Sequence, residues 1–167
     1  MFSVVVRTYL RVRLGRCPMG DWLDDLKRAE QDRDRTESED RKWRLHCAQL
    51  IDAKGPDLWR ELAERVASDV KRVAQVFPNK DSMRLEFEDN GDDFTLTNPS
   101  QRRNYKAAWR ADKRVIDLEL RLNFPEERVT REEITFHVTD KDEVQMRFAG
   151  TAMPESISEK LIRKLLP

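Results

Sequence analysis

Two stretches in the first half of the chain carry apolar residues every three or four positions, which is the spacing of one face of an α-helix. The first stretch contains Trp22, Leu23, Leu26, Ala29, Trp43, Cys47 and Leu50. The second contains Leu58, Leu62, Val66, Val70, Val73 and Phe77. Gly55 and Pro56 lie between them, where glycine favours a helix end and proline the first position of a new helix. We therefore predict two N-terminal helices, over about residues 21–54 and 56–77.

Residues 30–42, EQDRDRTESEDRK, interrupt the first apolar stretch and contain no apolar group except the methyl of Thr36. Opposite charges four positions apart, such as Glu37 and Arg41, suit a helix surrounded by water. The segment is either the solvated middle of a long helix or a frayed join between two helices. A charge run of this kind is most often only a solvated face, and the alternative is an arm that docks a protein partner.

After Lys80 the period of the pattern changes to two, which predicts β-strands. Asn90-Gly91 marks a hairpin turn between the first two of them. About six strands follow, with apolar positions at Met83, Leu85 and Phe87; Phe94 and Leu96; Tyr105, Ala107 and Trp109; Ile116, Leu118, Leu120, Leu122 and Phe124; Ile134, Phe136 and Val138; and Val144, Met146 and Phe148. Each strand is apolar on one side only, so the antiparallel sheet needs helices on one face.

A short helix is predicted at the end of the chain, where Ser156 and Glu159 have the spacing of a capping box. Its apolar stripe consists of Ile157, Leu161, Ile162 and Leu165. The predicted fold class is α+β, with two N-terminal helices, an antiparallel sheet of about six strands and a short C-terminal helix. The helices pack on one face of the sheet, in a single domain over residues 19–167.

Residues 1–18 contain four arginines and no acid, and three interpretations remain open for them. They are a disordered leader or organelle presequence, the product of a mis-assigned start with Met19 the true first residue, or an extra strand over residues 3–14. With that strand, the order of elements resembles the helix-grip fold of START and Bet v 1-type proteins, whose curved sheet closes over an apolar ligand pocket. The long N-terminal and short C-terminal helices are the reverse of that fold, and no family is inferred.

The 167 residues are 38% charged and 38% hydrophobic, with four Trp and seven Phe, so a solvated protein with a real core is expected. The net charge is zero, and the four arginines of the first 18 residues leave −4 for the rest, which argues against a dedicated nucleic-acid binder. Two cysteines form no disulfide framework and fit a reducing compartment, which favours the cytoplasm. No apolar run approaches the ~20 residues of a membrane span.

The segment 101–114 is basic and contains two aromatic residues, as nucleic-acid-binding surfaces do. Its candidate phosphate-binding residues are Arg102, Arg103, Lys106 and Arg110. Strand alternation places Tyr105 and Trp109 on the face opposite that of Lys106 and Arg110, so the rings would point into the core and the basic groups would pair with acids on neighbouring strands. We expect an ordinary strand. The two arginines of the preceding loop keep weak nucleic-acid binding open as an alternative.

A small-molecule pocket between the sheet and the helices is a further alternative. It would be lined by Phe94, Trp109, Leu120 and Phe136. Residues of this kind more often form plain core.

No residue pattern indicates catalysis, a cofactor or a metal. Residues 86–97 echo a calcium loop, but Thr97 stands where a glutamate is needed. His46 and Cys47 are adjacent, so a helix directs them ~100° apart, and with Cys17 and His137 they have no metal-ligand spacing. Five glycines and no GxSxG, Walker-type or GxGxxG motif argue against a phosphate cradle. The sequence thus favours a small, soluble, non-catalytic binding or accessory protein that acts by protein–protein contact, with residues 30–42 as its candidate arm.

Overall fold

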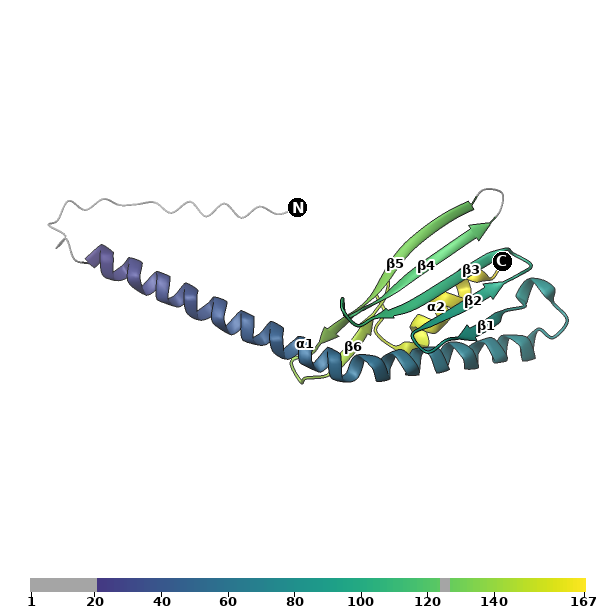
Figure 1. The fold of residues 1–167 in the computed structure, drawn as a ribbon, viewed down its shortest axis with the longest axis horizontal. Helices are drawn as coiled ribbons and strands as arrows, with labels where there is room; N and C mark the ends of the chain where they lie inside the picture. Colours follow the sequence, from purple (N-terminus) through teal and green to yellow (C-terminus); the bar gives the residue numbers. More distant parts are fainter. Residues whose placement is uncertain (1–20, 124–126) are drawn as a thin grey trace. The chain divides into compact units, whose positions relative to one another are not determined.

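The computed structural model describes residues 21–123 and 127–167, and the predictions made for residues 1–18 lie outside them. The elements are α1 (Asp21–Val76), the 3₁₀ helix η1 (Asp81–Met83), β1 (Glu86–Asp89), β2 (Asp93–Asn98), β3 (Arg103–Arg110), β4 (Val115–Asn123), β5 (Glu127–Val138), β6 (Val144–Arg147) and α2 (Pro154–Leu165) (Figure 1). The six strands pair in chain order, each antiparallel to the next. The predicted α+β class, the six-stranded antiparallel sheet and the short C-terminal helix are confirmed.

The chain divides into two compact units, Met1–Lys42 and Trp43–Pro167, and each is described by itself. The second unit contains the sheet, η1, α2 and the part of α1 that follows Lys42. Within the ranges that the structure describes, no helix is both long and apolar enough to cross a membrane.

α1 is one continuous helix where two were predicted, and Pro56 lies inside it. Proline removes one backbone hydrogen bond, which normally weakens or kinks a helix interior. The sequence predicts a helix end at Gly55, but a Cβ at this position would lie 2.8 Å from atom Cη2 of the Trp109 ring. The glycine is therefore required by the close approach of β3 to an uninterrupted helix.

Three hairpin turns of the sheet contact α1 through polar groups, and these contacts explain why the helix continues past its proline. The contacts are Trp59 Nε1 to Gly91 O (2.7 Å), Arg114 Nε to Asp52 Oδ1 (2.7 Å) and His46 Nε2 to Asp142 Oδ1 (2.9 Å). They belong to the turns β1–β2, β3–β4 and β5–β6. The helix is thus held to the sheet on both sides of Pro56.

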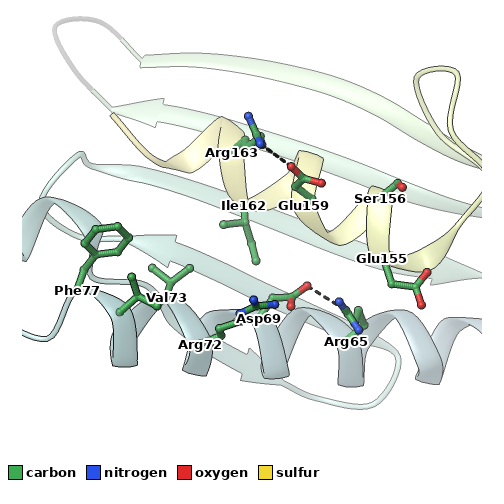
Figure 2. Close-up of a pocket in the computed structure, with 11 residues that line it drawn as sticks. Arg65, Asp69, Arg72, Val73, Phe77, Glu155, Ser156, Glu159, Ile162 and Arg163 are labelled. Atoms are coloured by element: carbon green, nitrogen blue, oxygen red, sulfur yellow. Dashed lines mark hydrogen bonds and ion pairs between the residues drawn. The ribbon is translucent and has the colours of Figure 1, made fainter.

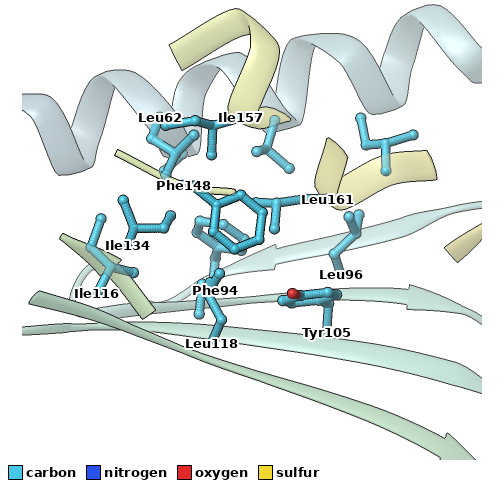
Figure 3. Close-up of a cluster of buried hydrophobic side chains, with 14 of the residues drawn as sticks. Leu62, Phe94, Leu96, Tyr105, Ile116, Leu118, Ile134, Phe148, Ile157 and Leu161 are labelled. Carbon is cyan, nitrogen blue, oxygen red and sulfur yellow. The ribbon is translucent and has the colours of Figure 1, made fainter. Parts of the chain in front are cut away.

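The core lies between one face of the sheet and the two helices (Figure 3). α1 and α2 supply Trp59, Leu62, Ala63, Val66, Val70, Ile157, Leu161, Ile162 and Leu165. The strands and the segment after β6 supply Phe94, Leu96, Tyr105, Ala107, Ile116, Leu118, Ile134, Met146 and Phe148. The predicted stripe of α1 omitted Trp59, which is 3% exposed, and included Phe77, which lies beyond the helix and is 41% exposed.

α2 begins at Pro154, so the predicted capping box of Ser156 and Glu159 is wrong. Proline is well suited to the first turn of a helix because the amide hydrogen that it lacks would have no helical partner there. The other end of α2 is held by Asn98, which is fully buried and donates from Nδ2 to Leu165 O (3.0 Å) and to Ser82 O (3.0 Å).

Candidate protein-interaction site

Within residues 22–42, the exposed large apolar side chains lie near the start of α1. Trp22 is 57% exposed, Leu23 46% and Leu26 56%. Every side chain from residue 22 to residue 42 is exposed. Three large apolar groups within one and a half turns of a helix form a surface of the kind that protein partners cover.

Residues 30–42 are helical throughout, so the interpretation as a frayed join between two helices is wrong. Arg35 Nε donates to Glu39 Oε1 at 3.0 Å across one helical turn. The hydroxyl of Thr36 donates to the backbone oxygen of Asp32 at 2.8 Å. Contacts within the helix thus stabilise this solvated segment.

The four basic residues proposed for nucleic-acid binding do not lie on one surface. Arg103 is on the helix side of the sheet, where its Nη1 donates to Leu166 O (2.8 Å) and Lys164 O (3.2 Å). It therefore stabilises the C-terminal end of α2. Arg102 is in the turn before β3 with a φ of 51°, in the left-handed region.

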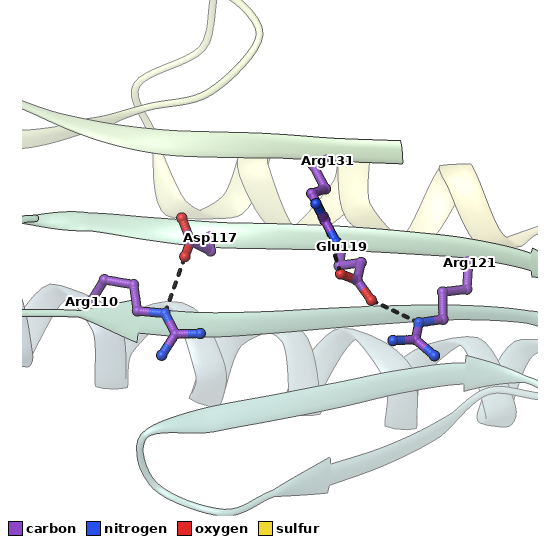
Figure 4. Close-up of polar contacts among 5 residues, drawn as sticks. All are labelled: Arg110, Asp117, Glu119, Arg121 and Arg131. Carbon is purple, nitrogen blue, oxygen red and sulfur yellow. Dashed lines mark hydrogen bonds and ion pairs between the residues drawn. The ribbon is translucent and has the colours of Figure 1, made fainter. Parts of the chain in front are cut away.

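Lys106 and Arg110 lie on the opposite, solvated face of the sheet, and both pair with acids of neighbouring strands. Lys106 Nζ is 3.0 Å from Asp93 Oδ2, and Arg110 Nε is 3.0 Å from Asp117 Oδ2. Figure 4 shows the second pair together with Glu119, which is contacted by two arginines of the same face. The expected cross-strand ion pairs are confirmed, and this face carries balanced rather than basic charge.

Of the four residues proposed to line a ligand pocket, Phe94 belongs to the buried core and the other three are half-buried against it. Phe94 is fully buried and stacks on Trp59 with ring centroids 5.1 Å apart. Trp109 and Phe136 meet edge to face with centroids 5.2 Å apart, and Leu120 packs against the same cluster. All four side chains therefore belong to the hydrophobic cluster between the sheet and the helices or pack against it.

A groove of about 340 Å³ lies between α1 and α2 in the second unit (Figure 2). Val73, Phe77 and Ile162 are apolar residues that line it. Its charged residues are Arg65, Asp69, Arg72, Glu155, Glu159 and Arg163, and ion pairs join Arg65 to Asp69 and Arg163 to Glu159. Sequence reasoning missed this groove because it depends on how the two helices pack.

Glu132 is an acid that the register places on the helix side of the sheet, opposite Leu118 of β4. Its Oε2 accepts a hydrogen bond from the Tyr105 hydroxyl at 2.7 Å and forms an ion pair with Nζ of Lys164 in α2. Burial and the neighbouring Glu132 carboxylate raise the pKa of Tyr105. The sequence carried the signal, because Glu132 is two positions before buried Ile134 and so shares its face.

Within residues 21–123 and 127–167, no three His, Cys, Asp or Glu side chains are arranged to hold a metal ion. His46 instead contacts Asp142 in the β5–β6 turn.

These observations define an α+β protein in which an antiparallel meander is covered on one face by two helices, with an exposed helical segment at residues 22–42. Comparison with protein-family models, curated proteins and solved structures gives no match.

Proposed function

We propose that the protein is a non-catalytic binding or accessory protein that acts through protein–protein contacts of residues 21–42. The observation that carries the proposal is the exposure of Trp22, Leu23 and Leu26, each at least 46%. Tryptophan is among the side chains that most often supply much of the binding energy at an interface. Burial of the two leucines adds the free energy of removing apolar surface from water. A cytoplasmic location is part of the proposal and rests on the small number of cysteines.

Binding of a small apolar ligand is the second candidate function, and the groove between α1 and α2 favours it. Its volume of about 340 Å³ is at the lower end of the range for ligand sites. The groove shares no lining residue with the predicted pocket of Phe94, Trp109, Leu120 and Phe136. Nucleic-acid binding has less support, because Arg103, Lys106 and Arg110 contact groups of the protein itself on two faces of the sheet.

The test is a pull-down from native cells with the full chain and with a Trp22→Ala/Leu26→Ala variant, each with and without nuclease. We expect a stoichiometric protein partner that survives nuclease and is lost with the variant. An Arg65→Ala/Arg72→Ala variant, altered in the groove instead, should keep the partner. Retention of every partner by the Trp22→Ala/Leu26→Ala variant would contradict the proposal, and partners that disappear with nuclease would favour the basic segment.

A further inference from the structure

The charges of residues 22–42 are divided between two faces of α1. Trp22, Leu26, Ala29, Arg33, Thr36 and Asp40 follow the three- and four-residue spacing that places them along one side of a helix, and the first three are its apolar members. We call the half of the helix around this line the stripe face, and the other half the back face. Because the segment is helical throughout, the sequence assigns each charged residue to one of them.

The stripe face is strongly acidic. Its acids are Asp25, Glu30, Asp32, Glu37 and Asp40, and its single base is Arg33. The back face is basic overall, with three acids, Asp24, Asp34 and Glu39, the last of which pairs with Arg35. Its bases are Lys27, Arg28, Arg35, Arg41 and Lys42. A helix that only needed solvation would gain nothing from this separation, since mixed charges on every face give the same number of stabilising pairs.

We propose that the partner of residues 21–42 is an amphipathic helix whose apolar stripe is flanked by lysine and arginine. This inference rests on the proposed function and names the chemistry of the partner. In paired helices, the residues beside the apolar stripe face one another and their charges select the partner. The segment is about 30 Å long, so a partner helix of about 20 residues would cover it.

The same charges argue against other occupants of the stripe face. A second copy would bring acid against acid in either helix orientation, which destabilises the pair. Nucleic acids and anionic membranes carry negative charge as well, and the stripe face would repel them.

The first measurement is the affinity of the full-length protein for two labelled 21-residue peptides, followed by fluorescence anisotropy. Both peptides carry the same leucine stripe, flanked in one by lysine and in the other by glutamate. We expect the lysine-flanked peptide to bind at least about tenfold more tightly, with a difference that shrinks as salt is added. Equal binding of the two peptides, or binding of neither, would overturn the inference.

Two variants with equal charge change separate the faces. Asp32→Lys/Glu37→Lys alters the stripe face and should weaken binding of the lysine-flanked peptide by about tenfold. Asp24→Lys/Asp34→Lys alters the back face and should change the affinity for the lysine-flanked peptide by less than about twofold. All four positions are exposed, and circular dichroism of both variants checks that the helix content is retained. If both variants bound the lysine-flanked peptide equally weakly, the change in net charge alone would explain the effect and the inference would be wrong.

The pull-down distinguishes this inference from the proposed function. Suppose that a cellular partner is lost with Trp22→Ala/Leu26→Ala but retained by Asp32→Lys/Glu37→Lys. This result would support the proposed function and contradict the inference that the partner is a basic amphipathic helix. A dimer in sedimentation that dissociates with Trp22→Ala/Leu26→Ala would identify a second copy as the occupant and likewise overturn the inference.

Discussion

Glu132 shows how a charged residue is accommodated on the side of a sheet that packs on helices. Its carboxylate joins the hydroxyl of Tyr105 in β3 to Lys164 in α2, so one side chain connects three elements. Tyr105 is 1% exposed and its hydroxyl would otherwise be buried without a partner. An unpaired buried hydroxyl is costly, so the acid stabilises the fold through its neighbours as well as through the ion pair.

The pH dependence of this contact follows from the pKa of Glu132. Burial acts to raise this pKa, but the hydrogen bonds from Lys164 and Tyr105 outweigh it and lower the pKa below its ordinary 4.5. A carboxyl whose pKa is lower in the folded state stabilises the protein above the pKa of the unfolded state. This stabilisation is lost as the pH falls through the folded-state pKa.

We expect Glu132→Gln to lower the free energy of unfolding at pH 7 by about 1–2 kcal/mol and to flatten its loss in acid. The measurement is urea unfolding from pH 7 to pH 3. Glu133→Gln is the matched control, because Glu133 is the exposed neighbour on the other face of the sheet. If the Glu132 and Glu133 variants lost stability in parallel as the pH fell, the assigned role would be wrong.

At the level of elements, α1 depends on one glycine for its approach to the sheet. Gly55 faces the ring of Trp109, and that ring is held in place by Phe136. Alanine is the better helix former by ~1 kcal/mol, so propensity alone predicts a stabilising substitution. The steric contact predicts the opposite.

We expect Gly55→Ala to lower the free energy of unfolding by about 1 kcal/mol, because overpacking of ~1–3 kcal/mol exceeds the gain in propensity. The measurement is chemical denaturation of both single variants and the Trp109→Phe/Gly55→Ala double variant. In the Trp109→Phe background the alanine should be neutral or stabilising, since the smaller ring leaves room. A Gly55→Ala variant more stable than the wild type would show that the ring moves freely.

The helices and strands that have one apolar side could be predicted from the sequence. The ends of the elements and the contacts between distant elements could not. The alternation around Ile116 and the stripe around Leu161 depend only on local geometry, and both are buried as predicted. The end predicted at Gly55 was wrong because contacts with the turns of the sheet outweigh a local helix-breaking signal. The α1–α2 groove and the contact of Arg103 with the end of α2 depend on packing between distant segments, which no local pattern encodes.

At the scale of the whole second unit, the sheet and the helix pair differ in how far their contacts reach along the chain. Each strand pairs with its neighbour in the chain. The contact from Ser158 Oγ in α2 to Asp69 Oδ2 in α1, at 2.8 Å, joins residues 89 positions apart. Closing so long a loop costs more conformational entropy than forming a hairpin.

The meander should therefore belong to the folding nucleus, with the two helices joining late. Ser158→Ala should lower stability by about 1 kcal/mol and appear as an unfolding rate about fivefold higher, with the folding rate unchanged. Ile116→Val in β4, with a similar loss of stability, should slow folding instead. Stopped-flow kinetics over a range of urea would decide between them, and equal slowing of folding by both variants would contradict this order. Unfolding would then begin with separation of α2 from α1, so the unit would first open along the groove between its helices.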